Sequence, residues 1–536
     1  AKGNAAGPNG EPVWVEKDIP LQGELDVKQP RIYYGENSPT YSIVGRPKGS
    51  TPIEVDTPRS GTGSSDKTGE NATQNTYDGK GGVPVGGMFS KLLYAVKFSE
   101  PNIVLSSRVN DESKILYDRK PRDRVEKVAP WLTVDGDSYP AVVDGRVVWI
   151  VDAYTTSDSY PYAEKVSLQE ATSDTLTGRG AQARLPSDQV NYVRNSVKAV
   201  VDAYDGSVHL YQWDTEDPIL KTWMKIFPDA VTPKSDVSPE LRAHLRYPVD
   251  MFKVQRDILA KYHVTDPQTF YEGSERWKVP EDPAADQDTT QPPYYLSISR
   301  PGEDSPKFSL TSVYVPNNRQ NLASFVSVNS EASDEKGYGT MQILQLTSDT
   351  QVDGPSQIAN AFQSDGGVSQ ALLQYKQTGT NILYGNLLTL PVGDALLYVQ
   401  PVYIKRQASE GAYPVLQYVI ASFGKDVGYG ATLDEALRVA LGLKPGETTG
   451  ASEGGATSEG GGTSGGGNGN TGGGNGSTGS QSADALIDRA AKEYEAAQKA
   501  LKAGNLSSYQ DHVDKMGDYL QQAQKAAGTP PPKPKQ

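Results

Sequence analysis

Alternating apolar and polar residues around two Asp-Gly pairs predict a pair of β-hairpins. In residues 141–151 the alternation is centred on Asp144-Gly145, and in residues 197–213 it is centred on Asp205-Gly206. Asp-Gly favours the type I′ turn that joins two antiparallel strands, and the flanking residues are rich in β-branched and aromatic side chains. The pattern therefore places antiparallel sheet in the first half of the chain.

Helical periodicity with capping signals appears between and after these hairpins. Asp217-Pro218 and Ser238-Pro239 each join a capping side chain to a proline suited to the first helical turn, and Thr432 begins a capping box with Glu435. The expected helices cover residues 89–98, 119–127, 218–226 and 248–262, with another from Pro239, two between 355 and 376, and one after Thr432.

Short apolar runs of strand length dominate the second half of the chain. The runs are residues 308–315, 323–328, 341–345, 386–390, 395–403 and 415–423. Together with the two hairpins, they predict an α+β fold of several subdomains, in which antiparallel sheets are combined with short helices.

Composition divides the chain into five parts. The predicted parts are an αβ region at 1–285, a second αβ region at 294–445, a linker at 446–482, a helical hairpin at 483–527 and a Pro-rich tail at 528–536. The linker consists mostly of Gly, Ser, Thr and Asn, which cannot form a core and behave as a flexible coil. The helical hairpin is interpreted either as a tethered docking module or as a plain helical tail.

The overall composition narrows the classes of function. The 536 residues include no Cys, which excludes disulfides, thiolate metal sites and a cysteine nucleophile. A net charge of −14 argues against nucleic-acid binding by the chain as a whole. The chain has 30 Tyr and only 9 Phe. Tyrosine suits half-buried surfaces, where its ring packs on apolar groups and its hydroxyl reaches water. No apolar run reaches the ~20 residues that span a bilayer, and we expect no cofactor.

Three aspartates at the first hairpin have the chemistry of a cation site without its spacing. Asp135, Asp137 and Asp144 offer carboxylate oxygens, but Tyr139 and Pro140 stand where a calcium loop needs a ligand and a glycine. Aspartate is also intrinsically common in turns. We therefore expect no metal, with a looser metal site of these three aspartates as the alternative interpretation.

A second acidic group lies at the other hairpin and consists of Asp202, Asp205, Asp214, Glu216 and Asp217, of which the four aspartates are the catalytic candidates. Two carboxylates held ~5–10 Å apart can hydrolyse a glycosidic bond, and the nearby rings of Tyr211 and Trp213 suit the face of a sugar. The chemistry of turns and helix caps accounts for the same aspartates. Catalysis by the aspartates and ligand binding by the two aromatic residues therefore stand as hypotheses beside a structural interpretation.

Four longer segments, at residues 133–158, 191–206, 315–322 and 385–403, carry specific motifs. They include TVDGDSYPAVVDG, NYVRNSVK, VPNNRQNL and GNLLTLPVGDALLYVQPVY. In this order the segments resemble the uncharacterised protein family UPF0182, membrane proteins of actinobacteria, cyanobacteria and some clostridia. The resemblance covers residues 10–445.

The resemblance implies a multi-pass membrane protein with about seven membrane helices in its N-terminal half and a large C-terminal domain outside the cytoplasm. This chain begins with Ala1 rather than Met and resembles the second half alone, so we expect it to be that extracytoplasmic domain. Because the family supplies no catalytic residues, we expect a binding or scaffold module for an envelope protein, lipid or glycan rather than an enzyme. The alternatives are an envelope glycan or lipid hydrolase or transferase, and the periplasmic domain of a transporter.

Overall fold

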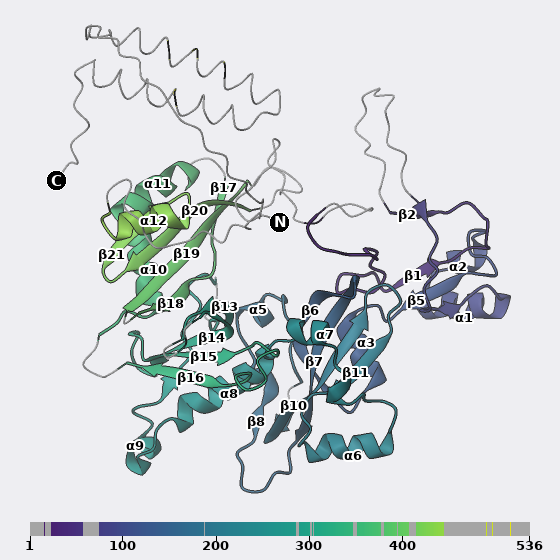
Figure 1. Ribbon diagram of the computed structural model, residues 1–536, viewed down its shortest axis with the longest axis horizontal. Helices are drawn as coiled ribbons and strands as arrows, with labels where there is room; N and C mark the ends of the chain where they lie inside the picture. The colour runs from purple at the N-terminus through teal and green to yellow at the C-terminus, as the bar shows by residue number, and fades with distance from the viewer. Residues whose placement is uncertain are drawn as a thin grey trace, which may run out of the picture. The chain divides into compact units, whose positions relative to one another are not determined.

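The computed structural model describes residues 23–56 and 74–443, with short gaps at residues 187, 286–288, 301–302, 304, 347–350, 377–379, 394 and 407–413, and a few isolated positions elsewhere (Figure 1). The predicted linker, helical hairpin and Pro-rich tail lie outside the described residues. Within them, the α+β class is confirmed, because every sheet is antiparallel and the helices are short. None of the helices in the described part combines the length and the apolar character that crossing a bilayer requires.

A small three-stranded sheet precedes the first predicted hairpin. Its order is β1 (Tyr41–Val44), β5 (Lys114–Tyr117) and β4 (Val83–Pro84). Helices α1 (Met88–Phe98) and α2 (Asn102–Leu105) lie beside it. The predicted helix at 89–98 is confirmed, while the strands were not expected, because two to four residues are too few to show a periodic pattern. A separate pair joins β2 (Glu54–Val55) to β3 (Gln74–Asn75).

Both predicted hairpins belong to one four-stranded sheet. Its order is β11 (Val208–Gln212), β10 (Tyr192–Asp202), β7 (Arg146–Ser157) and β6 (Thr133–Val143). The first turn has φ of +53° at Asp144 and +75° at Gly145, as a type I′ turn requires. The second turn differs from the expectation, because only Gly206 has a positive φ, +71°, and the side chain of Asp202 caps a longer loop by accepting from two backbone amides.

Successive residues of β7 and β10 belong to two different apolar clusters, one on each face of the sheet. On one face, Val151 and Val201 pack against α3 (Pro121–Val128) and α6 (Pro218–Ile226). On the other, Ile150 and Val200 pack against α7 (Pro239–His244). Successive side chains of a strand point to opposite faces, so a strand covered on both sides is apolar throughout.

A second sheet packs against the long helix α8 (Val249–Tyr262). Its path is β12 (Trp277–Lys278), β14 (Lys307–Pro316), β15 (Ser324–Asn329) and β16 (Met341–Gln345), with β13 (Tyr294–Ile298) also paired to β14. The apolar face of α8, which includes Phe252, packs on Leu310 and Val326 of this sheet. The helix thus joins its core to strands that follow it in the chain.

The third sheet is sandwiched by helices. Its path is β17 (Thr380–Tyr384), β19 (Ala395–Arg406), β20 (Val415–Phe423) and β21 (Asp426–Gly430), with β18 (Leu388–Val392) also on β19. Helices α10 (Pro355–Ser364) and α11 (Gly366–Lys376) cover one face, and α12 (Leu433–Ala440) covers the other. Thr432 caps α12 as predicted, but the Glu435 carboxylate accepts from the amide of Ala431 instead of closing the capping box.

Short elements complete the described part, and sequence periodicity did not indicate them. They are β8 (Val166–Ser167), α4 (Leu168–Ala171), α5 (Thr175–Gly178), β9 (Gln189–Val190), the 3₁₀ turn η1 (Lys234–Asp236) and α9 (Pro267–Glu272).

Candidate functional site

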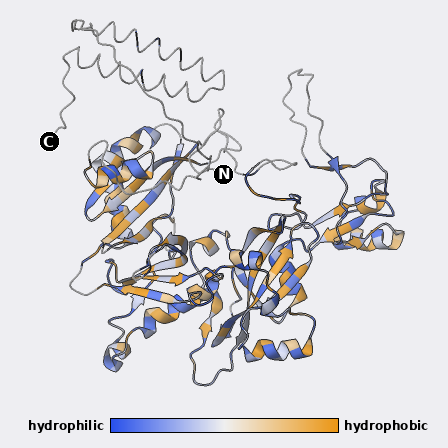
Figure 2. Cartoon of the chain, viewed as in Figure 1, coloured by the Kyte–Doolittle hydropathy of each residue, from blue (hydrophilic) through white to orange (hydrophobic). Residues whose placement is uncertain are grey.

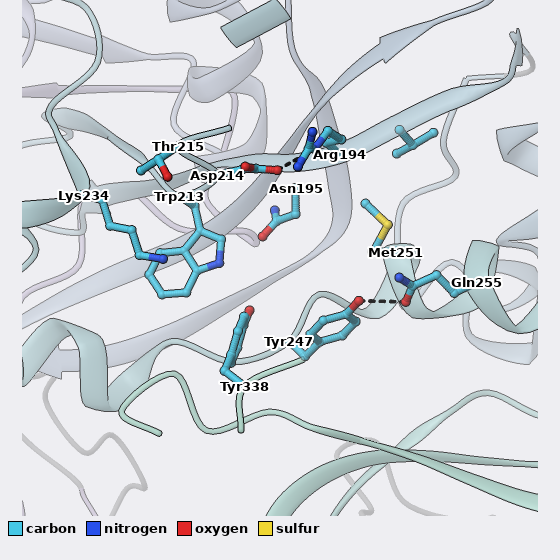
Figure 3. A pocket seen from close by; sticks show the side chains of 11 residues that line it. Arg194, Asn195, Trp213, Asp214, Thr215, Lys234, Tyr247, Met251, Gln255 and Tyr338 are labelled. Atoms are coloured by element: carbon cyan, nitrogen blue, oxygen red, sulfur yellow. Dashed lines mark hydrogen bonds and ion pairs between the residues drawn. The ribbon is translucent and has the colours of Figure 1, made fainter. Parts of the chain in front are cut away.

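A pocket of about 410 Å³ opens where five separate segments meet. The first half of β10, the residues after β11, the turn η1, the start of α8 and the loop between β15 and β16 each contribute side chains to its wall (Figure 3). The volume lies within the range of small-ligand sites. The pocket is therefore our candidate functional site.

A buried ion pair lies behind the lining residues Asn195 and Trp213. Lys198 of β10 and Asp152 of β7 are direct cross-strand partners, and Lys198 Nζ lies 2.5 Å from an oxygen of Asp152. The same ammonium donates to the carbonyl of Arg246 at 2.8 Å. Both side chains are 4% exposed or less, so removing either one would leave an unpaired charge in the interior.

Asn195 rests on this pair and presents an acceptor without a partner. Its Nδ2 donates to Asp152 at 3.0 Å, and because a carboxylate only accepts, this bond determines which way the amide is turned. Its Oδ1 is buried and accepts no hydrogen bond from any described residue. Figure 3 shows the amide between Trp213, Tyr338 and Met251. A buried acceptor of this kind is costly unless a water or ligand supplies a donor.

Aromatic rings form one wall. Trp213 and Tyr338 meet edge to face, with centroids 5.4 Å apart, and Tyr247 lies 5.7 Å from Tyr338. The Tyr247 hydroxyl donates to Gln255 at 2.8 Å. Burial raises the pKa of both tyrosines, and the charge of Asp152 adds to the rise at Tyr338. The phenols therefore stay protonated, and that of Tyr338 donates to the carbonyl of Arg246 at 3.2 Å.

Two basic side chains lie at the rim of the pocket, and only one of them is paired with a carboxylate that the structure describes. Arg194 is paired, because its Nε lies 2.6 Å from Asp214. Lys234 forms no ion pair with a carboxylate of the described residues, and its ammonium lies 4.2 Å from the centroid of the Trp213 ring. Burial, followed by repulsion from Arg242, lowers the pKa of Lys234. The rim thus offers one cation that is free to donate.

The lining offers hydrogen-bonding groups and few acids or bases. Among its described residues are neither histidine nor serine, and the only carboxylate, Asp214, is held by Arg194. Lys234 can donate and Asn195 Oδ1 can accept, and these are the two kinds of hydrogen bond that hydroxyl groups form.

Two of the four predicted aspartates lie at the turn of the second hairpin and face Arg146. Asp202 accepts from Arg146 Nε at 2.6 Å, and Asp205 lies 3.6 Å from the same guanidinium. Burial alone would raise the pKa of Asp202, but the hydrogen bonds from Arg146 and from two backbone amides outweigh it and lower the pKa.

Asp217 is the N-cap of α6 and is fully buried. It accepts five hydrogen bonds, from the amides of Ile219 and Leu220 and from the hydroxyls of Ser196, Thr155 and Tyr192. Burial opposes ionisation, but the three hydroxyls and the amides prevail and lower its pKa. A carboxylate that is this well solvated by the protein stays charged, so it is not suited to act as a general acid.

Asp202 and Asp205 form one pair of aspartates, Asp214 and Asp217 form the other, and strand β10 separates the two pairs. Asp202 ends the strand, whereas the amides of Trp213 and Asp214 bond to the carbonyl of Ser196, six residues earlier. At about 3.3 Å per residue the pairs are about 20 Å apart, so a carboxylate of one pair cannot act with one of the other pair across the ~5–10 Å that a glycosidase requires. The structure thus does not bring the four aspartates together, and each has a turn, cap or ion-pair partner.

The three aspartates of the alternative metal site also lie apart. Asp135 and Asp137 belong to a bulge in β6, while Asp144 lies in the turn at the other end of that strand. Asp135 accepts from the hydroxyl of Tyr154, and burial raises the pKa of Asp135 well above its usual value. Asp137 pairs with Arg246. Within the described residues, no group of three or more acidic or histidine side chains could hold a metal.

Of the two predicted aromatic residues, Trp213 lines the pocket and Tyr211 does not. Tyr211 lies on β11 opposite Lys198 and packs with the apolar cluster around Val200. Sequence reasoning missed the remaining wall, including Lys234, because its residues come from segments with no spacing signal in common.

Comparison with known proteins identifies the family. The profile of "Uncharacterised protein family (UPF0182)" matches residues 1–375. UPF0182 proteins of Arthrobacter sp. (strain FB24) and Nocardioides sp. (strain ATCC BAA-499 / JS614) are each 47% identical, over 98% and 90% of this chain and 52% and 46% of their own length. One from Streptomyces coelicolor is 44% identical over 98% of this chain and 50% of its own length.

The chain therefore spans about half the length of the curated relatives that it matches. No solved structure matches the chain significantly. The relatives carry no functional name beyond that of the family. On the profile match and the identities, the chain belongs to the uncharacterised protein family UPF0182.

Proposed function

We propose that the described part of the chain is a non-catalytic binding module that holds a hydroxyl-rich ligand, such as a sugar unit of an envelope glycan, in the Trp213 pocket. We further propose that it acts outside the cytoplasm as one part of a larger membrane protein. The observation that carries the binding proposal is the buried, unpartnered Oδ1 of Asn195 in the same wall as the unpaired ammonium of Lys234.

The chemistry of the wall supports a sugar over an apolar ligand. One ligand hydroxyl can donate to Asn195 Oδ1 and another can accept from Lys234, while the phenol of Tyr338, which donates to the carbonyl of Arg246 at 3.2 Å, can accept from a third. The ring faces of Trp213 and Tyr247 suit the C–H faces of a pyranose. An apolar ligand would leave Asn195 and Lys234 without partners, at a cost of about 1–3 kcal/mol for each buried group.

Titration calorimetry with soluble envelope oligosaccharides tests the proposal. Lys234→Met should weaken binding about 10- to 100-fold, since hydrogen bonds to charged groups contribute about 1.5–3 kcal/mol. The matched control is Lys221→Met, because Lys221 is an exposed lysine on α6 whose nearest carboxylate lies at 3.6 Å. Equal affinities of Lys234→Met and the native chain, or no binding by the native chain, would contradict the proposal.

The same incubations separate binding from hydrolysis. A binding module should return every oligosaccharide intact, as judged by mass spectrometry after prolonged incubation. Release of shorter sugars would contradict the proposed binding module. It would support the hydrolase alternative, even though β10 separates the two pairs of aspartates.

The location is tested in intact cells. A membrane-impermeant amine reagent should label exposed lysines such as Lys221 in the full-length protein without cell lysis, because the proposal places this part of the chain outside the membrane. Labelling only after lysis would contradict the proposed location and leave the binding experiment unaffected.

A further inference from the structure

Helix α1 presents large apolar side chains to solvent. Five of its eleven residues are apolar and 54–73% exposed: Met88, Phe89, Leu92, Leu93 and Val96. At about 100° per residue they fall within a single sector about 140° wide. On the adjoining helix α2, Leu105 is 77% exposed. Contiguous apolar surface of this kind on a soluble domain usually marks an interaction site.

The opposite side of α1 already has its partner. Tyr94 and Phe98 pack on the small sheet with Ile103 and Ile115. These partly buried side chains hold the helix to the sheet, and the outward apolar residues take no part in that packing. Figure 2 shows apolar residues along this helix.

Helix α1 itself is positively charged, whereas Asp111 lies against Gly86 just before the helix and the chain as a whole is acidic. The helix contains Lys91 and Lys97 and no acidic residue. Residues 88–108 hold three basic side chains and one acidic, a net charge of +2 in a chain of −14. Lys97 is exposed beside the apolar sector, with its ammonium 3.9 Å from the centroid of the Tyr117 ring. A long lysine stem of this kind can reach from an apolar surface to a charged headgroup.

We propose that α1 is a membrane-docking helix, which inserts its outward apolar residues into the interface of an anionic lipid bilayer. A helix with one strongly apolar side and flanking lysines is suited to lie in the plane of such an interface. Anionic headgroups attract the local positive charge, whereas the acidic remainder of the chain would be repelled. The same charge disfavours pairing of α1 with a second copy, because two cationic helices would be brought together.

Flotation of the full 536-residue chain with vesicles tests the proposal. Vesicles of phosphatidylcholine with about 30% phosphatidylglycerol represent the anionic surface, and pure phosphatidylcholine vesicles represent the neutral one. We expect at least about tenfold stronger partitioning onto the anionic vesicles, lost largely in 0.5 M salt because exposed charges are then screened. Equal partitioning onto both vesicles, or onto neither, would overturn the proposal.

A triple substitution assigns the effect to the helix. Phe89→Ser, Leu93→Ser and Val96→Ser together should reduce partitioning more than a hundredfold, because each removes a side chain that the bilayer would bury. These side chains lie outside the packed cluster, so circular dichroism and the unfolding midpoint should stay close to native.

A control triple removes equally exposed apolar side chains elsewhere, at Ile226, Tyr271 and Val439. It should partition like the native chain. Sedimentation of the native chain without vesicles tests whether a second copy of the chain occupies the α1 surface instead. A dimer that the α1 triple dissociates, or equal losses in the two triples, would refute membrane docking by α1.

Discussion

Replacing Lys253 with methionine removes a cation that two buried carboxylates share. Lys253 Nζ lies 2.8 Å from Asp174 and 3.3 Å from Asp250, and it donates to Gln182 at 2.9 Å. The lysine side chain is 0% exposed and the two carboxylates are 0% and 2% exposed. Methionine fills a similar volume but offers neither charge nor donor.

The expected loss in the free energy of unfolding is about 4 kcal/mol at pH 8. Removing one partner of a buried ion pair costs about 3–5 kcal/mol, because the remaining charge is left uncompensated. Some compensation stays in place, since Asp250 also accepts from the amide of Gly136 at 2.8 Å and Asp174 accepts from the amide of Thr177 at 3.0 Å. The estimate therefore lies in the middle of the range.

The loss should depend on pH. Burial raises the pKa of Asp250, and Lys253 opposes that rise in the native chain. Without the lysine the pKa rises further above that of the unfolded chain, so folding of the variant favours the protonated acid. Stability from such a group is present below the unfolded pKa of about 3.9 and is lost as the pH rises through the folded pKa. The difference from the native chain should thus shrink between pH 8 and pH 5.

Urea unfolding followed by tryptophan fluorescence at both pH values measures this difference. Lys261→Met on the same helix is the matched control, because Lys261 pairs with Glu164 at 2.6 Å near the surface and should cost less than about 1 kcal/mol. If Lys253→Met cost no more than this control, or if its cost were the same at pH 8 and pH 5, the reasoning from buried charge would be refuted.

Three other substitutions test local features by urea unfolding. Asp217→Asn should cost about 2–4 kcal/mol of unfolding free energy at pH 7. Because the pKa of Asp217 is lowered in the folded chain, its stabilisation is present above the unfolded pKa and should vanish as the pH falls through the folded pKa. A loss that did not change with pH would contradict this. Gly428→Ala should cost about 1–3 kcal/mol, since a Cβ there would lie 2.2 Å from a backbone oxygen of α12, whereas Gly366→Ala, with open space around it, should be neutral. Gly145→Ala should cost about 1 kcal/mol through its φ of +75°, and no loss would argue against the type I′ turn.

Local signals predicted much of the secondary structure. Asp217, Ser238 and Thr432 cap their helices as expected, since a cap depends only on residues within one turn. The Asp144-Gly145 turn adopts the predicted geometry for the same reason. The second hairpin deviates because the side chain of Asp202 competes for the turn amides, which residue preferences alone do not reveal.

The candidate site was only partly accessible to sequence reasoning. Trp213 was identified from its aromatic character beside an acidic group, but Asn195, Lys234 and Tyr338 carry no shared spacing and meet only through the packing of β10, η1 and a loop after β15. In the opposite direction, Asp202 and Asp217 are close in sequence, yet an extended strand carries them far apart.

Sequence by itself therefore determined the family, the α+β class and the positions of many helices and strands, because these depend on long matched segments and on preferences of neighbouring residues. Tertiary structure alone decided which charges are buried and paired, and which polar groups face a pocket. Partners distant in sequence offset the desolvation free energy of burying Lys253 and Asn195. The packing of sheets and helices determines which residues become those partners.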